Sequence, residues 1–243
     1  MFWRSGEAML DAEFTKRRRD FAVRLSLRLG AGQSVGLFGA SGSGKSTVLA
    51  CIAGVEQPDE GRIDFGGLRL FPPSLPLYQR PVGYLTQEPS LFPHLSVREN
   101  VVFGVPKREA SVPECAAWIA TLKDRLQLAP LWEAPAARIS GGQARRVALA
   151  RMLARKPPLV LLDEPFAGLD RQLVRELIDD LIFWSRSAGF SMIAVDHQSE
   201  VLMRLCPESA IVLEQGQVVQ RGAWSDICSA PATPLLGSLL AQL

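Results

Sequence analysis

The sequence of 243 residues predicts an α/β fold built around a mainly parallel β-sheet. Short apolar runs with the length of buried strands recur along the chain, and segments with helical spacing separate them. A glycine-rich loop follows one run and two carboxylates follow another, which suits a parallel sheet because ligands bind at the carboxyl ends of its strands. No convincing strand lies between Glu88 and Pro158, so this stretch is predicted to be a helical insertion.

The strands are predicted in order from their apolar residues. Leu25, Leu27 and Leu29 alternate with polar residues, and a Gly-Ala-Gly turn ends this first strand. The last predicted strand continues into a hairpin that turns at Gly216. Between them, buried strands are predicted at residues 34–38, 82–86, 159–162, 192–195 and 210–213.

Two helices have clear signals. Ser111 and Glu114, with Pro113 between them, have the spacing of a capping box and predict a helix over residues 116–126. Near the end of the chain, leucines at helical spacing predict a helix that packs on the core. These leucines are Leu235, Leu236, Leu239, Leu240 and Leu243.

Composition limits the classes of function. Hydrophobic residues make up 47% of the chain, enough for a full core in one domain with an inserted lobe. The 27 basic and 25 acidic side chains nearly balance, so nucleic acid is not expected as a partner. The 4 cysteines lack metal-type spacing, and no apolar run approaches the roughly 18 to 20 residues that span a bilayer. A role at a membrane would require a separate subunit.

A phosphate-binding loop follows the predicted strand at 34–38. Two glycines five positions apart precede Lys45 and Ser46, and a helix-forming run comes next. Backbone N–H groups of such a loop converge on phosphate oxygens, and the helix N-terminus adds its dipole. Lys45 is expected to reach the β- and γ-phosphates, and the Ser46 hydroxyl to bind Mg²⁺. The predicted nucleotide-binding residues are Gly39, Ala40, Ser41, Gly42, Ser43, Gly44, Lys45, Ser46 and Thr47.

Two carboxylates, Asp163 and Glu164, close the predicted strand at 159–162. This places them at the same edge of the sheet as the phosphate loop. Asp163 is predicted to hold Mg²⁺ directly or through water. Glu164 is predicted to orient and deprotonate an attacking water molecule.

A third motif opens a predicted helix between the phosphate loop and the paired carboxylates. It consists of Ser140, Gly141, Gly142 and Gln143. A helix N-terminus with two glycines and a hydroxyl suits phosphate binding, although the chain already has one phosphate loop. In this order the three motifs resemble those of the ATPase subunits of ABC transporters. The resemblance extends from Met9 to about Gly222.

The resemblance implies further site residues. Gln87, after the strand at 82–86, is expected to contact Mg²⁺ and the attacking water, and the loop after it to touch a transmembrane partner. His197, after the strand at 192–195, is expected to contact the γ-phosphate. Asp170 matches the loop through which two ATPase subunits sense each other's sites, and its position also suits a helix N-cap. The resemblance also assigns the general base to Glu164.

The implied fold is a P-loop NTPase core of the ABC ATPase type, with a small antiparallel β subdomain and a helical subdomain inserted at about residues 88–158. One domain is expected over 9–243, after an irregular extension at 1–8. ATP and Mg²⁺ are the implied cofactors. Two copies, expected to be a homodimer, would pack head to tail, each closing residues 140–143 over the nucleotide of the other. The implied partners are a transmembrane permease, which holds the ATPase at the cytoplasmic face of the membrane, and an extracytoplasmic solute-binding protein.

The adenine contact has several candidates in the loop near residues 14–21. A guanidinium group of Arg17 or Arg18 could stack on the base, or Phe14 or Phe21 could replace it. A solvated basic turn without any contact is the alternative.

The sequence also leaves open which solute is transported and whether the ATPase has a transport role. Residues 9–14 resemble molybdate importers, and residues 91–101 resemble importers of oxyanions, iron, polyamines and sugars. The alternative functions are a soluble ABC-type ATPase without a transport role and a regulatory ATP-binding cassette. Met9 rather than Met1 is a candidate initiator, and the chain is expected to be too short for an appended regulatory domain.

Overall fold

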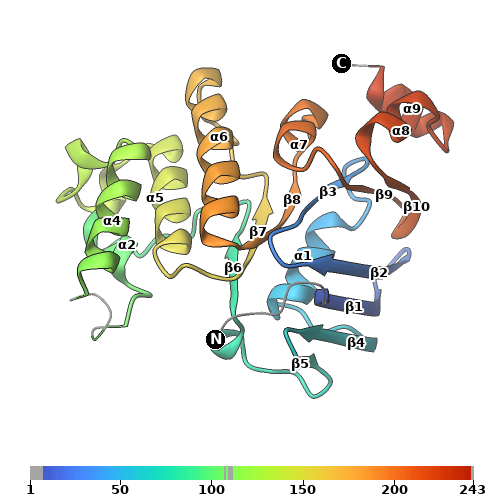
Figure 1. The fold of residues 1–243 in the computed structure, drawn as a ribbon, viewed down its shortest axis with the longest axis horizontal. Helices are drawn as coiled ribbons and strands as arrows, with labels where there is room; N and C mark the ends of the chain where they lie inside the picture. The colour runs from blue at the N-terminus through green and yellow to red at the C-terminus, as the bar shows by residue number, and fades with distance from the viewer. Residues whose placement is uncertain (1–7, 107, 109–111, 242–243) are drawn as a thin grey trace.

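The computed structural model describes residues 8–106, 108 and 112–241. A six-stranded sheet runs through the centre of the molecule in the order β10-β9-β3-β8-β7-β6 (Figure 1). Its neighbouring strands are parallel, except for the hairpin of β9 and β10. The strands are β3 (Ser34–Phe38), β6 (Val82–Leu85), β7 (Leu159–Asp163), β8 (Ser191–Val195), β9 (Ala210–Glu214) and β10 (Gln217–Gly222). The predicted parallel core is confirmed.

A second sheet has four antiparallel strands in the order β2-β1-β4-β5. They are β1 (Ala8–Arg17), β2 (Ala22–Gly30), β4 (Glu60–Phe65) and β5 (Leu68–Phe71). The predicted alternation of leucines in β2 is confirmed, because its odd-numbered residues from 23 to 29 face the core. The strand β1 begins at Ala8, one residue before the predicted start of structure, and residues 1–7 of the predicted extension lie outside the described residues.

Helices flank both sheets and fill the interval between β6 and β7 (Figure 1). Among the described residues of this interval there are helices and no named strand, as expected for residues 88–158. The α-helices whose bounds the structure describes are α1 (Lys45–Ala53), α2 (Val97–Val102), α4 (Pro113–Arg125), α5 (Gly141–Leu153), α6 (Arg171–Ala188), α7 (Ser199–Leu205), α8 (Trp224–Ser229) and α9 (Pro234–Leu240).

The start of α4 differs from the prediction. Val112 holds the N-cap position and its side chain makes no capping bond, whereas the sequence predicts Ser111 as the cap. Ser111 itself lies outside the described residues. A full capping box begins α2, where the side chains of Ser96 and Glu99 each accept a hydrogen bond from the backbone N–H of the other residue. This capping box was not predicted from the sequence.

The core lies on both faces of the six-stranded sheet. Successive residues of β7 show this arrangement, since Leu159 and Leu161 pack with α1 and the small sheet while Val160 and Leu162 pack with the helices of the other face. Every residue of β7 and β8 is buried, as expected for strands covered on both sides. A rigid central sheet of this kind holds the ends of β3, β6, β7 and β8 in fixed relative positions.

The leucines of α9 pack as predicted only in part. Leu236 and Leu240 are buried in the core, but Leu235 is 47% exposed because it lies on the outer face of the helix. Leu243 lies outside the described residues.

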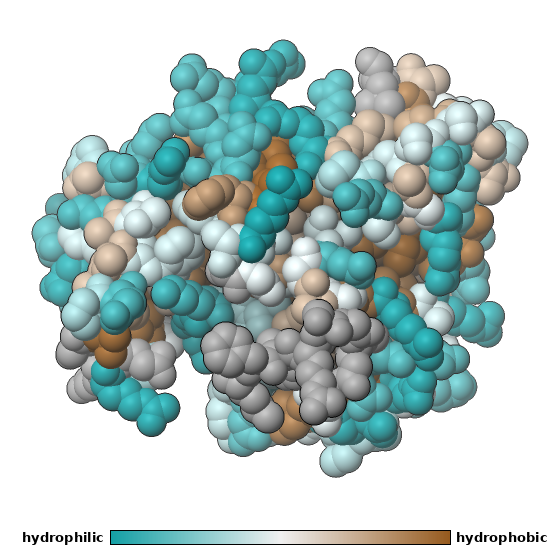
Figure 2. Space-filling model, viewed as in Figure 1, coloured by the Kyte–Doolittle hydropathy of each residue, from teal (hydrophilic) through white to brown (hydrophobic). Residues whose placement is uncertain are grey.

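Hydrophilic and near-neutral residues cover most of the face shown in Figure 2, and the hydrophobic residues visible there form separate groups. In the described ranges, no helix combines the length and the apolar character that crossing a bilayer requires.

Candidate active site at the strand ends

The phosphate loop connects β3 to α1. Gly39 and Gly44 have φ angles of +143° and +104°, in the left-handed region that favours glycine. A Cβ atom on Gly39 would lie 2.1 Å from a backbone oxygen of β9, and one on Gly44 would lie 2.6 Å from a side chain of β2. The loop therefore needs glycine at both positions. It leads into the first turn of α1, which contains Lys45, Ser46 and Thr47.

Lys45 is almost fully buried within the loop. Its Nζ donates hydrogen bonds to the carbonyl oxygens of Gly39 at 2.9 Å and Ala40 at 2.8 Å. Burial lowers the pKa of Lys45, and the charges of Asp163 and Glu164 oppose that shift. An anion in this loop would meet a desolvated positive charge, which attracts it more strongly than an exposed lysine would.

Asp163, at the end of β7, is buried beside the phosphate loop. Its Oδ1 accepts a hydrogen bond from Ser46 Oγ at 3.1 Å, and its Oδ2 accepts one from the Tyr84 hydroxyl at 3.4 Å. Burial raises the pKa of Asp163, and these two hydrogen bonds oppose that shift. A divalent cation would favour the ionised carboxylate.

The pair of Ser46 and Asp163 fits Mg²⁺, because hydroxyl and carboxylate oxygens are the hard ligands that this ion prefers. Among the described residues there is no cluster of three or more His, Cys, Asp or Glu side chains that could hold a metal alone. A magnesium ion here would therefore take its other ligands from the nucleotide and from water, as Mg²⁺ commonly does at phosphate sites.

Three side chains that the sequence predicts separately meet here, because Gln87 and His197 both contact Glu164. The Nε2 atom of His197 lies 2.6 Å from Glu164 Oε1, and the Nε2 atom of Gln87 donates to Glu164 Oε2 at 3.0 Å. Glu164 has a φ of +50°, which is strained for a residue with a side chain, and its N–H donates to the carbonyl of Val195. The ends of β6, β7 and β8 thus converge on one carboxylate, which is 18% exposed.

Among the described residues, the Ser-Gly-Gly-Gln segment makes no hydrogen bond to this cluster. Ser140 caps α5, its Oγ accepting from the Gln143 N–H at 3.3 Å while Gln143 Oε1 accepts from the Ser140 N–H. A Cβ atom on Gly141 would meet no atom within 4 Å. Gly142 lies against its own chain, where an added Cβ would be 3.0 Å from the carbonyl oxygen of Gly168. Within the described residues, no hydrogen bond joins 140–143 to the phosphate loop.

Asp170 caps the next helix. Its Oδ1 accepts a hydrogen bond from the N–H of Leu173 at 2.9 Å, so the predicted N-cap of α6 is confirmed. A role in sensing a second subunit stays a prediction.

Two residues of the site were not identified from the sequence. Tyr84 bonds Asp163, as given above, and strand alternation in β6 was the signal that places its side chain on the α1 side. Arg145 is 3% exposed and its Nη1 donates to the carbonyl of Thr86 at 2.6 Å. This bond connects α5 to the residue before Gln87. No local sequence pattern predicts it.

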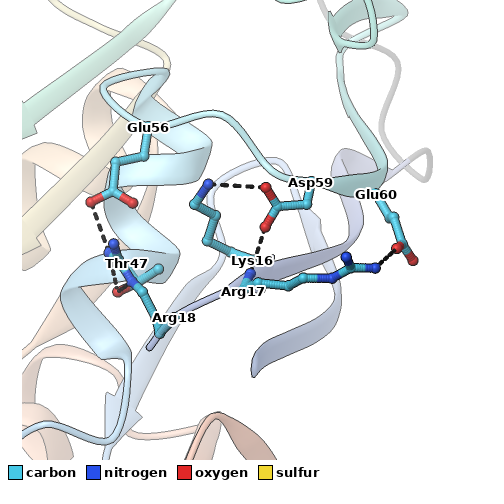
Figure 3. A network of polar contacts seen from close by, with 7 residues as sticks. All are labelled: Lys16, Arg17, Arg18, Thr47, Glu56, Asp59 and Glu60. Atoms are coloured by element: carbon cyan, nitrogen blue, oxygen red, sulfur yellow. Dashed lines mark hydrogen bonds and ion pairs between the residues drawn. The ribbon is translucent and has the colours of Figure 1, made fainter. Parts of the chain in front are cut away.

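The candidates for an adenine contact lie at the end of β1 and in the loop that joins it to β2. Phe14 is buried in the core, so its ring cannot stack on a ligand. Phe21 is half-buried and faces Gly44 of the phosphate loop. Arg17 points away and pairs with Glu60, whereas Arg18 extends toward α1 (Figure 3).

His197 also lines two clefts at this edge of the sheet. One, of about 290 Å³, is bounded by the first residues of the phosphate loop and by α7, with Leu239 of α9 on its rim. The other, of about 520 Å³, is bounded by Glu164, by residues 166–169 and by the starts of α6 and α7. The cluster around Glu164 is therefore reachable from outside the protein.

The sequence of the chain has many relatives. A sulfate/thiosulfate import ATP-binding protein of Thermosynechococcus vestitus is 37% identical over 217 residues, which are 89% of this chain and 64% of that protein. A molybdenum import ATP-binding protein of Rhodopseudomonas palustris is 37% identical over 92% of this chain and 59% of its own length. A probable sulfate/thiosulfate import ATP-binding protein of Chlorella vulgaris is 36% identical over 96% and 98%. The chain thus spans less than two thirds of the first two relatives.

Solved structures share the fold. An ATP-binding subunit of an ABC transporter has a TM-score of 0.80 at 24% identity, with 95% of this chain and 99% of that one covered. A nucleotide-free ATP-binding cassette has a TM-score of 0.79 at 22% identity, with 96% and 98% covered. At this identity the likeness concerns the fold.

Residues 23–167, which include the phosphate loop and the paired carboxylates, match the family described as ABC transporter. The phosphate loop, the capped α5 and the carboxylates at the end of β7 follow one another in this order along the chain, as the resemblance predicts. By this match and by its relatives, the chain belongs to the ABC transporter family.

Proposed function

We propose that the chain is the ATP-binding and ATP-hydrolysing subunit of an ABC importer. The observation that carries this proposal is the meeting of Gln87, Glu164 and His197 beside the phosphate loop. Three strand ends supply these groups, and a purely structural role would not require a strained, accessible carboxylate at that point.

In the proposed reaction Lys45 and the N–H groups of the loop hold the β- and γ-phosphates of ATP. Glu164 accepts a proton from water, and Gln87 and His197 hold its carboxylate in place from either side. His197 is also proposed to contact the γ-phosphate. Magnesium, when bound at Ser46 and Asp163, supplies charge neutralisation for the phosphates.

A second copy of the chain would complete the site. The Ser-Gly-Gly-Gln segment makes no bond to the phosphate loop of its own chain within the described ranges, and Gly141 faces open space at the N-terminus of α5. A helix N-terminus attracts phosphate, so a free one suits the nucleotide of a partner. We therefore place two nucleotides at the interface of a head-to-tail homodimer.

The proposed contact with the permease lies next to Gln87. A groove of about 500 Å³ is lined by Pro89, Phe92 and Phe103, and Phe103 is 60% exposed. Arg151 donates to the carbonyls of Pro89 and Ser90, so the wall of the groove continues into the segment that carries Gln87. A permease segment in this groove would sense movement of Gln87 on hydrolysis, at the cytoplasmic face of the membrane.

The proposed solute is a tetrahedral oxyanion, delivered by an extracytoplasmic binding protein. Relatives named for sulfate/thiosulfate and for molybdenum match this chain at the same level of identity, 37%. Sulfate and molybdate share charge and shape, and an ATPase subunit does not contact the solute. The proposal therefore covers both anions, and molybdate has no preference over sulfate.

Hydrolysis by the isolated chain tests the proposal. We expect Mg²⁺-dependent release of phosphate from ATP, with activity that rises faster than linearly with protein concentration because two copies form each site. The assay compares activity with Mg²⁺ and with EDTA over a wide range of protein concentration. Tight ATP binding without hydrolysis, even after addition of a permease partner, would instead indicate a regulatory cassette.

A further inference from the structure

The β1–β2 loop carries an arginine whose contacts the proposed reaction does not use. Arg18 Nη2 donates to Thr47 Oγ1 at 2.7 Å, and its Nε lies 3.2 Å from the same oxygen. Thr47 is 8% exposed and lies in the first turn of α1, at the end of the phosphate loop. An arginine from a distant hairpin therefore bonds directly to a residue of the predicted nucleotide site (Figure 3).

Hydrogen bonds of Arg18 and of the two residues before it hold the backbone at this position. The N–H of Arg17 donates to Asp59 Oδ2 at 2.6 Å, and Lys16 Nζ donates to Asp59 Oδ1 at 3.2 Å. The N–H of Arg18 donates to the carbonyl of Phe21 at 2.8 Å and closes the turn. These bonds hold the end of the hairpin, so the Arg18 side chain starts from a defined place beside α1.

Glu56 holds the guanidinium group from the other side. Arg18 Nη2 lies 2.8 Å from Glu56 Oε1, and about one third of each side chain is exposed, 35% and 32%. Among the bonds of the described residues, none uses the two N–H groups of Arg18 Nη1. The group thus keeps donors for a further acceptor while it stays at the loop.

The way the group is held indicates what it binds. Bonds to Thr47 and Glu56 occupy Nε and Nη2, which leaves the N–H groups of Nη1 for an oxygen of the phosphate chain. Guanidinium N–H groups bind phosphate oxygens, whereas stacking on a base uses the flat face. The first turn of α1 also directs its own N–H groups toward anions. We infer that Arg18 contacts the phosphate chain of the nucleotide on the Thr47 side of the loop and does not act by stacking on adenine. This inference rests on the proposed binding of ATP.

The test compares three ligands: ATP, GTP and inorganic tripolyphosphate. Tripolyphosphate has the phosphate chain without base or ribose, so it separates the two modes of contact. Dissociation constants are measured in EDTA, which prevents turnover, by competition with a fluorescent ATP analogue. The variants are Arg18→Ala and Arg18→Lys. Arg17→Ala is the control because Arg17 is in the same hairpin, carries the same charge and is 72% exposed without touching α1.

We expect Arg18→Ala to weaken binding of all three ligands by about tenfold. Arg18→Lys should lose less affinity, because lysine keeps the positive charge but cannot donate two parallel hydrogen bonds. Arg17→Ala should change each constant by less than about twofold.

Other results would overturn the inference. A loss confined to ATP and GTP would indicate contact with base or ribose, and equal losses in Arg17→Ala and Arg18→Ala would indicate only long-range charge. Absence of any loss in Arg18→Ala would also contradict it. A wild-type chain that binds none of the three ligands would refute ATP binding itself, and the inference with it.

Discussion

Replacement of Glu164 by glutamine is expected to lower kcat for ATP by about 10³-fold while ATP still binds. The change removes the proposed proton acceptor, and a positioned general base contributes about 10² to 10⁴ in rate. Glutamine keeps the size of the side chain, so the contacts to Gln87 and His197 can persist in altered form. The affinity for ATP should persist because the proposed phosphate contacts, Lys45 and the loop, are unchanged.

Single-turnover hydrolysis with excess protein, together with a binding assay, separates the two effects. Glu200→Gln is the matched control, since Glu200 is an exposed carboxylate on the rim of the clefts near His197. Its rate should stay within about twofold of wild type, as usual for a surface substitution. Hydrolysis by Glu164→Gln at more than about one tenth of the wild-type rate would show that another group accepts the proton.

Replacement of Arg80 by methionine is expected to destabilise the fold by about 3 kcal/mol. Arg80 is 3% exposed, and every N–H of its guanidinium group has a recorded acceptor. The acceptors are the carbonyls of Cys51, Ile52, Leu70 and Leu75 and the hydroxyl of Ser74. Methionine fills part of the volume but leaves these buried oxygens without their donors.

Urea unfolding measures this loss. Arg17→Met is the control, because the ion pair of Arg17 with Glu60 is 72% and 62% exposed and should contribute less than about 1 kcal/mol. A loss in Arg80→Met no larger than in the control would show that water replaces the guanidinium group at no cost. The end of α1 and the loop after β5 would then not depend on Arg80.

The sequence predicts the parallel sheet well because its strands are covered on both faces. Continuous apolar runs such as those of β7 and β8 follow from that burial and are visible without any structure. The strands β4 and β5 were not predicted, since each is short and half exposed, and the strand that joins them to the rest of the sheet, β1, lies far from β4 in the chain.

The residues of the site also differ in whether the sequence predicts their positions. Motif residues that follow a strand, such as Lys45 and Glu164, could be located because the edge of a parallel sheet gathers them. Arg80 and Arg145 could not, because most of their acceptors are carbonyl oxygens of other segments of the chain. A buried arginine that binds backbone atoms leaves no pattern in its neighbouring residues. The pairing of Arg18 with Thr47 could not be predicted either, because the two side chains lie 29 positions apart in the sequence.

Mixing two inactive variants tests whether two copies of the chain pack head to tail. Lys45→Ala removes the lysine of the phosphate loop. Gly141→Glu adds a negative charge where the structure has open space, so it should repel the nucleotide of a partner without disturbing its own fold. Each variant alone should be inactive, because both sites of either homodimer carry a defect.

A mixed dimer of the two variants has one site with both defects and one site with none. Chains with two different tags, coexpressed and purified through both, provide this dimer. We predict that mixing restores Mg²⁺-dependent hydrolysis, up to about a quarter of the wild-type rate in a random mixture, where half of the dimers carry one intact site. Activity of the mixed dimer no greater than that of the separate variants would show that each chain builds its site alone, and would contradict the head-to-tail dimer.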